Sequence, residues 1–237
     1  MAGDKRGGRG GPGSRRGGRG GGRGAGGQKS RRSTSQKRDQ DHYARKAQAQ
    51  GYQARSVFKL EEMDQRLGLL RAGQRVVDLG CAPGSWSRYA RSRIGPSGHL
   101  VGVDLKEVDG FPGTFLCEDL EGLTAQRLGE LLGGKAHVVL SDMAPNTSGA
   151  KDLDHLRQIS LAEAALDRAC ALLRPGGSFV VKVFDGRDAP AFTAQMRSAF
   201  EVVKRQRPDA TKRQSREFFL VGLRFRGTPS QPGEGAA

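Results

Sequence analysis

Four ionisable residues lie in segments whose apolar character should exclude them. Lys182 interrupts the run SFVVKVF, Asp142 ends HVVLSD, and Glu217 opens EFFLVGL. Lys59 lies three residues after Ser56, in the first turn of an expected helix, where the helix dipole disfavours a cation. Removing an unpaired charge from water is costly, so such residues persist when they pair or when chemistry needs them. The four therefore predict either a structural ion-pair cluster or a catalytic site with two ammonium groups and two carboxylates.

A second candidate site is the stretch DLGCAPGSW at residues 78–86, which follows a buried strand and contains Gly80 and Gly84. In open parallel sheets, ligands bind beyond the carboxyl ends of the strands, and glycines let the backbone approach a ligand closely. The stretch matches neither GxGxxG nor GxxxxGK[ST]. A pyrophosphate cradle or a P-loop is therefore a poor fit to this corner.

Two acids end the strand runs that come next in the chain. Asp104 closes VGVD, where an acid commonly accepts hydrogen bonds from ribose hydroxyls, and Asp119 ends the third run, where it would meet a base edge. Taken alone, either acid is an ordinary loop or capping residue. Together with the glycine corner they predict a nucleoside ligand without a pyrophosphate, namely S-adenosylmethionine, with its amino-acid part beside Gly80 and Gly84.

The elements that must position these residues alternate between short apolar runs and helical segments. Strands that are apolar on both faces and alternate with helices indicate a parallel sheet covered on both sides. Right-handed crossovers then predict an α/β, Rossmann-like, doubly wound and mostly parallel sheet. We expect strands at 75–79, 99–105, 114–119, 137–142, 178–184, 201–206 and 217–224, and helices after Ser56 (as N-cap) and at 85–93, 122–132, 152–173 and 189–200.

The motifs ARSVFKL, VVDLGCAPGSWS, VGVDL, SDMAPNTSG, FVVKVF and SREFFLVG occur in this order over about residues 54–224. Each string alone is weak, but the ordered set resembles the RrmJ/FtsJ family of RNA ribose 2′-O-methyltransferases. Family members often have two glycines before the tryptophan, whereas this chain has Gly84 followed by Ser85. The resemblance implies an S-adenosylmethionine-dependent methyltransferase with the same Rossmann-like fold.

The resemblance also implies roles for individual residues. It maps the family's Lys-Asp-Lys-Glu tetrad onto Lys59, Asp142, Lys182 and Glu217. A ribose hydroxyl is a weak acid, so catalysis needs alignment of the attacking oxygen and a place for its proton. We expect Lys182, held in position by Asp142, to accept the proton. Lys59 would make Lys182 easier to deprotonate and stabilise the alkoxide, and Glu217 would position the lysines. The implied cofactor-binding residues are Gly84, Trp86, Asp104, Asp119 and Asp142, and no metal is expected.

The expected substrate is RNA, modified on the sugar. The stretch DMAPNTSG has no aromatic residue to stack a flipped base, which favours a ribose over a base. Asn146, Thr147 and Ser148 are expected to line the RNA entrance. The resemblance implies a uridine of large-subunit ribosomal RNA as acceptor and a monomeric enzyme. Transfer RNA remains an alternative substrate, and an RNA-binding or chaperone protein that has lost the reaction remains an alternative of another class.

Charge supports a polyanionic partner. The net charge is +15, and residues 1–40 contain 12 Lys/Arg against 2 Asp/Glu. Glycine and arginine dominate this arm, so we expect 1–40 to be disordered and to add sequence-blind RNA affinity, with the basic segment 41–56 helping. The catalytic domain would then span 41–226 and a loose tail 227–237. Three scattered cysteines predict neither disulfides nor a zinc site, and no apolar run is long enough to cross a bilayer, so we expect a cytoplasmic protein.

Overall fold

The computed structural model describes residues 45–46, 49, 55–146, 148–212 and 214–227. The predicted arm at 1–40 lies outside the described residues. So do most of the basic segment 41–56 and all of the predicted tail except Gly227. The fold described below therefore begins in effect at residue 55.

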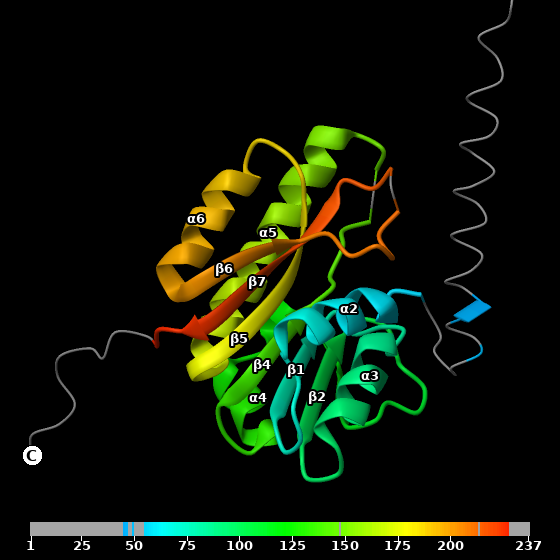
Figure 1. Cartoon of the computed structure of the whole chain (residues 1–237), viewed down its shortest axis with the longest axis vertical. Helices are drawn as coiled ribbons and strands as arrows, with labels where there is room; N and C mark the ends of the chain where they lie inside the picture. Colours follow the sequence, from blue (N-terminus) through cyan, green and yellow to red (C-terminus); the bar gives the residue numbers. More distant parts are fainter. Residues whose placement is uncertain (1–44, 47–48, 50–54, 147, 213, 228–237) are drawn as a thin grey trace, which may run out of the picture.

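Seven strands form one sheet in the order β3-β2-β1-β4-β5-β7-β6. Neighbours pair in parallel from β3 to β5, whereas β7 runs antiparallel to both β5 and β6 (Figure 1). The predicted α/β, mostly parallel, doubly wound sheet is thereby confirmed. The strands are β1 (Arg75–Leu79), β2 (His99–Asp104), β3 (Thr114–Cys117), β4 (Ala136–Ser141), β5 (Leu173–Phe184), β6 (Phe200–Gln206) and β7 (Glu217–Phe225).

Helices cover both faces of the sheet, and alternate strand residues serve two separate cores. Val77 and Leu79 of β1 pack in the core that includes α4, α5 and α6, whereas Val76 packs in the core that includes α2 and α3. Figure 1 shows α2 and α3 together near β1 and β2, and α5 and α6 beside the other end of the sheet. The helices are α2 (Val57–Leu67), α3 (Ser85–Ile94), α4 (Ala125–Leu132), α5 (Lys151–Leu172) and α6 (Ala189–Ala199).

Three local predictions need correction. Ser56 occupies the N-cap position of α2, but its side chain makes no capping hydrogen bond. The helix predicted from 122 begins at Ala125, because the Thr124 hydroxyl caps it by accepting from the Arg127 N–H, and a short 3₁₀ turn (Leu120–Gly122) precedes it. Strand β5 begins at Leu173 rather than 178, since its pairing with β4 shifts register across residues 174–177, of which 174–176 are exposed.

No helix in the described part of the chain is both long enough and apolar enough to span a bilayer. The three cysteines are free thiols, and Cys117 is exposed whereas Cys81 is buried.

Candidate active site at the carboxyl edge of the sheet

The four tetrad residues come from four different elements. Lys59 lies in the first turn of α2 and Asp142 directly follows β4. Lys182 lies within β5, and Glu217 is the first residue of β7. Their alternate neighbours Leu140, Val180 and Phe219 all pack in the core under α2 and α3. The strand residues of the tetrad therefore share one sheet face, the face on which α2 places Lys59.

Lys59 and Glu217 form an ion pair across 158 positions of sequence. Lys59 is buried, with 8% of its surface exposed, and its ammonium nitrogen lies 5.6 Å from the ring centre of Phe219. A carboxylate and the face of an aromatic ring each stabilise a cation that lies between them. Glu217 and Phe219 of β7 therefore offset the unfavourable position of the Lys59 ammonium in the first turn of a helix.

Lys182 and Asp142 form the second pair. The Lys182 ammonium donates to the Asp142 backbone carbonyl at 2.6 Å and lies 3.0 Å from the Asp142 carboxylate oxygen Oδ1. Lys182 is 7% exposed, although it lies in the middle of an apolar strand. Two contacts to one residue fix the position of Nζ at the carboxyl end of β4.

Phe219 connects the two pairs. It lies opposite Lys182 in the β5–β7 ladder, and its ring is beneath the Lys59 ammonium. The same ladder pairs Glu217 with Phe184, two residues beyond Lys182. The structure thus gathers two ammonium groups and two carboxylates on one face of the sheet, at the edge where the parallel strands end (the carboxyl edge).

The glycine corner adopts the left-handed backbone that its sequence indicates. Gly80 and Gly84 have φ of 72° and 92°. A Cβ at Gly80 would lie 2.3 Å from Met143, and one at Gly84 would lie 2.8 Å from Val108. Both glycines are therefore required by backbone conformation and by packing, independently of any ligand.

Asp104 and Trp86 brace this corner. Asp104 accepts the Ala82 N–H at 2.8 Å through Oδ2 and the Lys106 N–H at 2.9 Å through Oδ1. The buried Trp86 indole donates to the Ser56 carbonyl at 2.8 Å, and its ring centre lies 5.6 Å from that of Phe219. The corner and the tetrad are consequently joined through Trp86 and Phe219.

Asp119 lies apart from these contacts. Strand β3 ends at Cys117, two residues earlier than the predicted run, and Asp119 is exposed. Its backbone carbonyl accepts the Gly122 N–H at 3.2 Å in the turn that follows. Its side chain is therefore placed by a surface turn rather than by the sheet.

Sequence reasoning missed Asp78, a fully buried carboxylate on β1. It accepts a hydrogen bond from the Ser87 hydroxyl, whereas its Oδ1 has no partner among the described residues. Burial raises its pKa to about 7, and the nearby charges of Asp142 and Asp104 add to the rise. An acid within the apolar run RVVDL was a signal of the same kind as Lys182.

Gln158 of α5 was also missed. Its buried side-chain amide donates to the Lys182 carbonyl at 2.8 Å and to the Met143 carbonyl at 3.2 Å. It therefore ties β5 to the segment that carries Asp142. The available signal was a polar residue in line with the apolar positions Ala162, Ala165 and Ala169 of the same helix.

The corner fits the predicted cofactor. Helix α3 begins there without a side-chain cap, so its first N–H groups can receive a carboxylate. Asp78 Oδ1 and the Ser85 hydroxyl are buried polar atoms without partners in the described residues. These features suit the amino-acid part of S-adenosylmethionine, and the Asp104 carboxylate suits its ribose. Within the described chain, no cluster of His, Cys, Asp and Glu is arranged to hold a metal.

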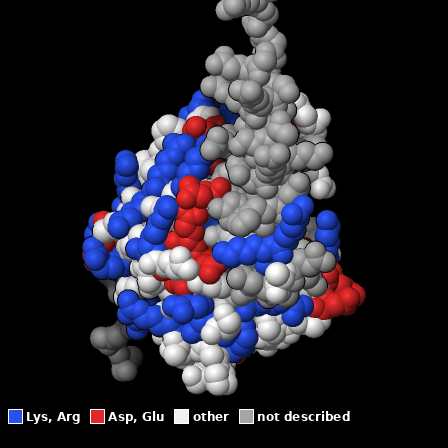
Figure 2. All heavy atoms as spheres, turned by 45° about the vertical axis from the view of Figure 1, so that its right-hand side comes forward, with Lys and Arg blue, Asp and Glu red and all other residues white. Residues whose placement is uncertain are grey.

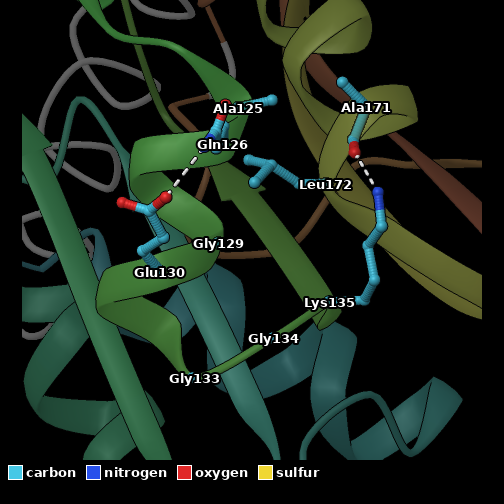
Figure 3. Close-up of a pocket in the computed structure, with 9 residues that line it drawn as sticks. All are labelled: Ala125, Gln126, Gly129, Glu130, Gly133, Gly134, Lys135, Ala171 and Leu172. Carbon is cyan, nitrogen blue, oxygen red and sulfur yellow. Dashed lines mark hydrogen bonds between the residues drawn. The ribbon is translucent and has the colours of Figure 1, made fainter.

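A cavity of about 620 Å³ lies at the opposite edge of the sheet, where the parallel strands begin (the amino edge). Figure 3 shows its wall of small residues on α4 and its lysine, Lys135, which donates to the Ala171 carbonyl at 2.7 Å. It adjoins the amino end of β4, where Ala136 begins the strand. Ligands of parallel sheets bind at the carboxyl ends, so this cavity does not compete as the cofactor site.

The family model and three known proteins that this chain resembles are all described as methyltransferases. The family model described as FtsJ-like methyltransferase matches residues 52–225. The chain is 48% identical over 190 residues to the ribosomal RNA large subunit methyltransferase E of Desulfatibacillum aliphaticivorans, covering 79% of this chain and 91% of that protein. It is 43% identical to the enzyme of the same name from Methanothrix thermoacetophila, covering 83% and 78%. A structure described as a ribosomal RNA methyltransferase from Plasmodium falciparum superposes with a TM-score of 0.66 at 26% identity, covering 75% of this chain and all of that one.

Proposed function

The chain belongs to the FtsJ-like methyltransferase family, and we propose that it transfers a methyl group from S-adenosylmethionine to a ribose 2′-hydroxyl of RNA. The observation that supports this most is the two ion pairs Lys59–Glu217 and Lys182–Asp142, whose lysines are buried, beside the glycine corner. A protein that only bound RNA would gain nothing from enclosing two lysines and two acids at a strand edge.

S-adenosylmethionine, when bound, supplies a methyl group that its sulfonium has already activated. The protein must therefore align the 2′-oxygen and take its proton. In this proposal the proton goes to Lys182 Nζ, so the attack requires this amine in its deprotonated form. The carbonyl and the carboxylate of Asp142 fix the position of that nitrogen. The Lys182 side chain can therefore present its lone pair to the 2′-hydroxyl without changing rotamer.

Lys59 supplies a positive charge. As the 2′-oxygen gains negative charge, a preorganised ammonium nearby lowers the energy of the transition state. Glu217 holds Lys59 in place, and Phe219 supports it from below. The Lys59–Glu217 pair thus stabilises the negative charge that develops on the 2′-oxygen, whereas the Lys182–Asp142 pair takes up the proton of the 2′-hydroxyl.

For the cofactor, we propose contacts by Gly84, Trp86, Asp104, Asp119 and Asp142. The Trp86 indole is already committed to Ser56, so its contact would come from the backbone N–H in the first turn of α3. Asp104 would accept the ribose hydroxyls with lone pairs that its two backbone contacts leave free. Asp119, on its surface turn, would reach the base.

For the substrate, we propose a uridine of large-subunit ribosomal RNA, methylated by a monomer. The names of the relatives support the ribosomal RNA. Figure 2 shows Lys and Arg side chains over much of the side on which α2 and α3 lie, interrupted by a smaller acidic group. A basic face of this kind attracts a polyanion and carries no sequence preference of its own.

The test is a transfer assay with labelled S-adenosylmethionine and either large ribosomal subunits or transfer RNA. We expect label in large-subunit RNA, within a dinucleotide that resists alkaline cleavage because its 2′-oxygen is blocked. Mass spectrometry of the digested nucleosides identifies the base. Label on a base, or RNA binding without any transfer by the folded protein, would reject the proposal, and label in transfer RNA alone would change the substrate.

A further inference from the structure

Strand β4 separates from β5 at the point where the tetrad begins. The last pair in the β4–β5 ladder is Ser141 opposite Val181. Asp142 and Lys182 would form the next pair, but they are joined by the Lys182 side chain, whose ammonium contacts the Asp142 carbonyl and carboxylate. The pair that takes up the proton in the proposed reaction therefore lies just beyond the last backbone pairing of the two strands.

Gln158 of α5 bridges the two strands at this point. Its side-chain nitrogen Nε2 donates to the Lys182 carbonyl at 2.8 Å and to the Met143 carbonyl at 3.2 Å. An amide nitrogen carries two hydrogens, so one side chain can satisfy both carbonyls. Met143 directly follows Asp142 in the chain. Gln158 therefore holds the backbone on both sides of the contact between Lys182 and Asp142.

The stability of the core does not by itself explain an amide at this position. Gln158 is 1% exposed, and its Oε1 is buried without a hydrogen-bond partner in the part of the chain that the structure describes. A buried acceptor that lacks a donor is destabilising. The buried positions that follow in line on the helix are alanines, at 162, 165 and 169. The two donors of Gln158 are thus used, whereas its oxygen gains nothing from burial.

The far end of the loop that follows β4 has an anchor of its own on α5. The Asp154 carboxylate accepts the Ser148 N–H at 2.7 Å, the Ser148 hydroxyl at 2.9 Å and the Gly149 N–H at 3.1 Å. Asp154 and Gln158 are four positions apart and so lie on one side of the helix. Asp154 attaches the loop at residues 148–149, and Gln158 attaches it at residue 143. Of these two attachments, the one at residue 143 adjoins the tetrad.

Met143 also packs against the glycine corner. A Cβ at Gly80 would lie 2.3 Å from the Met143 side chain and 3.2 Å from its Cα, so the two residues are in direct contact. The segment that Gln158 holds therefore lies between the corner and the tetrad. A displacement of Met143 would change the place of Asp142 relative to the corner where the cofactor is expected to bind.

We propose that Gln158 is a positioning residue for methyl transfer, which fixes Lys182 and Asp142 in the geometry that proton uptake requires. Because Gln158 is itself buried, it acts through these two residues. The inference rests on the proposed function, which assigns the proton to Lys182. A misplacement of about 1 Å that arises away from the reacting atoms can lower the rate by about 10²-fold, so the loss of two hydrogen bonds at this point should be measurable.

The first test observes the Lys182 side chain directly, by carbon-13 NMR of the full-length protein labelled at the lysine Cε atoms. Lys182→Gln and Lys59→Gln assign the two signals. Gln158→Met removes the amide at similar side-chain size, and it should shift the Lys182 signal while leaving the Lys59 signal in place. An unchanged Lys182 signal, or equal shifts of both lysines, would overturn the proposal. Since no methyl is transferred, failure of the proposed reaction would not alter this readout.

The second test compares methyl transfer to RNA by Gln158→Met and Leu166→Ala. Leu166 is buried on the same helix, two turns closer to the amino edge, so its truncation weakens the core away from the tetrad. Gln158→Met should lower kcat about tenfold to hundredfold at unchanged KM for RNA and for S-adenosylmethionine. Leu166→Ala should lower Tm and leave kcat unchanged. A raised KM without loss of kcat in Gln158→Met, or equal loss of kcat in both variants, would contradict the positioning role.

Two further variants keep the test decisive. Gln158→Asn retains the amide but is one methylene too short to reach both carbonyls, and it carries the same expectations if Gln158→Met does not fold. In an Asp142→Asn background, Gln158→Met should lower kcat by a much smaller factor than in the wild type, because the residue that it positions is already impaired. The same factor in both backgrounds would show that Gln158 does not act through Asp142.

Discussion

The two edges of the sheet contain the same chemical contact in opposite environments. At the carboxyl edge the Lys182 ammonium donates to the Asp142 carbonyl at 2.6 Å, and at the amino edge the Lys135 ammonium donates to the Ala171 carbonyl at 2.7 Å. Lys182 is 7% exposed and has a carboxylate beside it, whereas Lys135 is exposed and lies at an open cavity. Water screens the second contact but not the first.

Burial of the lysine, and not the hydrogen bond itself, therefore distinguishes the candidate active site. The amino edge has a cavity of about 620 Å³, but Gln126, Glu130 and Lys135 meet solvent there. At the carboxyl edge, each charge is enclosed with an opposite charge of fixed geometry. Size of a cavity is therefore a poor guide in this fold, and enclosed charge is a better one.

The largest expected effect is on activity at the carboxyl edge. Lys182→Ala should lower kcat by about 10²–10⁴, the usual contribution of a positioned proton acceptor. Lys135→Ala, at the other edge, should leave kcat unchanged. Transfer of labelled methyl to ribosomal RNA measures both variants, and circular dichroism verifies that both are folded. Equal activity of the two variants would remove Lys182 from the chemistry.

A second prediction concerns Asp78, beneath the glycine corner. Its pKa is raised from 3.8 to about 7 in the folded protein, so between these values the folded state keeps a proton that the unfolded chain has lost. Stability should therefore fall as pH rises through this window, and the penalty should be complete above about pH 7.

Asp78→Asn removes that penalty. The variant should be more stable than the wild type by about 1–4 kcal/mol at pH 8, with the difference vanishing near pH 4. Urea unfolding across this range, without cofactor, measures it. A variant less stable than wild type at pH 8 would mean that the ionised carboxylate is compensated by a partner.

A third prediction compares a buried ion pair with an exposed one that also involves β7. A double-mutant cycle on Lys59 and Glu217, with Lys59→Met and Glu217→Gln, should give a coupling energy of about 2 kcal/mol in stability. The pair Arg224–Glu201, whose side chains are 62% and 49% exposed, should give about 0.2–1 kcal/mol. Similar coupling in both cycles would show that solvent screens the Lys59 pair as well.

The smallest expected effect is on stability at the amino edge. Gly129 lies inside α4 at the wall of the large cavity, and a Cβ there would meet no atom within 4 Å. Gly129→Ala should raise the free energy of unfolding by about 0.5–1 kcal/mol, because alanine loses less backbone entropy in a helix. Thermal unfolding measures the gain, and methyl transfer should not change. Lost activity would indicate that the amino edge contributes to function.

Much of the fold and part of the candidate site could be predicted from local sequence patterns. Alternation of apolar runs with amphipathic segments predicted the doubly wound sheet, since burial on two faces leaves a direct mark on composition. The same reasoning singled out Lys182, Asp142 and Glu217, because a charge in an apolar run is conspicuous without any coordinates. The helix boundaries at 122 and the start of β5 were wrong, since capping by Thr124 and a register shift depend on hydrogen bonds that hydropathy does not record.

The pairing of Asp142 with Lys182 was expected from the family resemblance, whereas the pairing of Glu217 with Lys59 alone was decided by the tertiary structure. The sequence supplied two lysines and two acids, but only the order β4-β5-β7 gives Asp142 to Lys182 and leaves Glu217 for Lys59, 158 positions away. The same holds for Gln158 and Trp86, whose contacts join distant segments. Periodicity reports which residues are buried, whereas strand order and side-chain direction determine what each one is buried against.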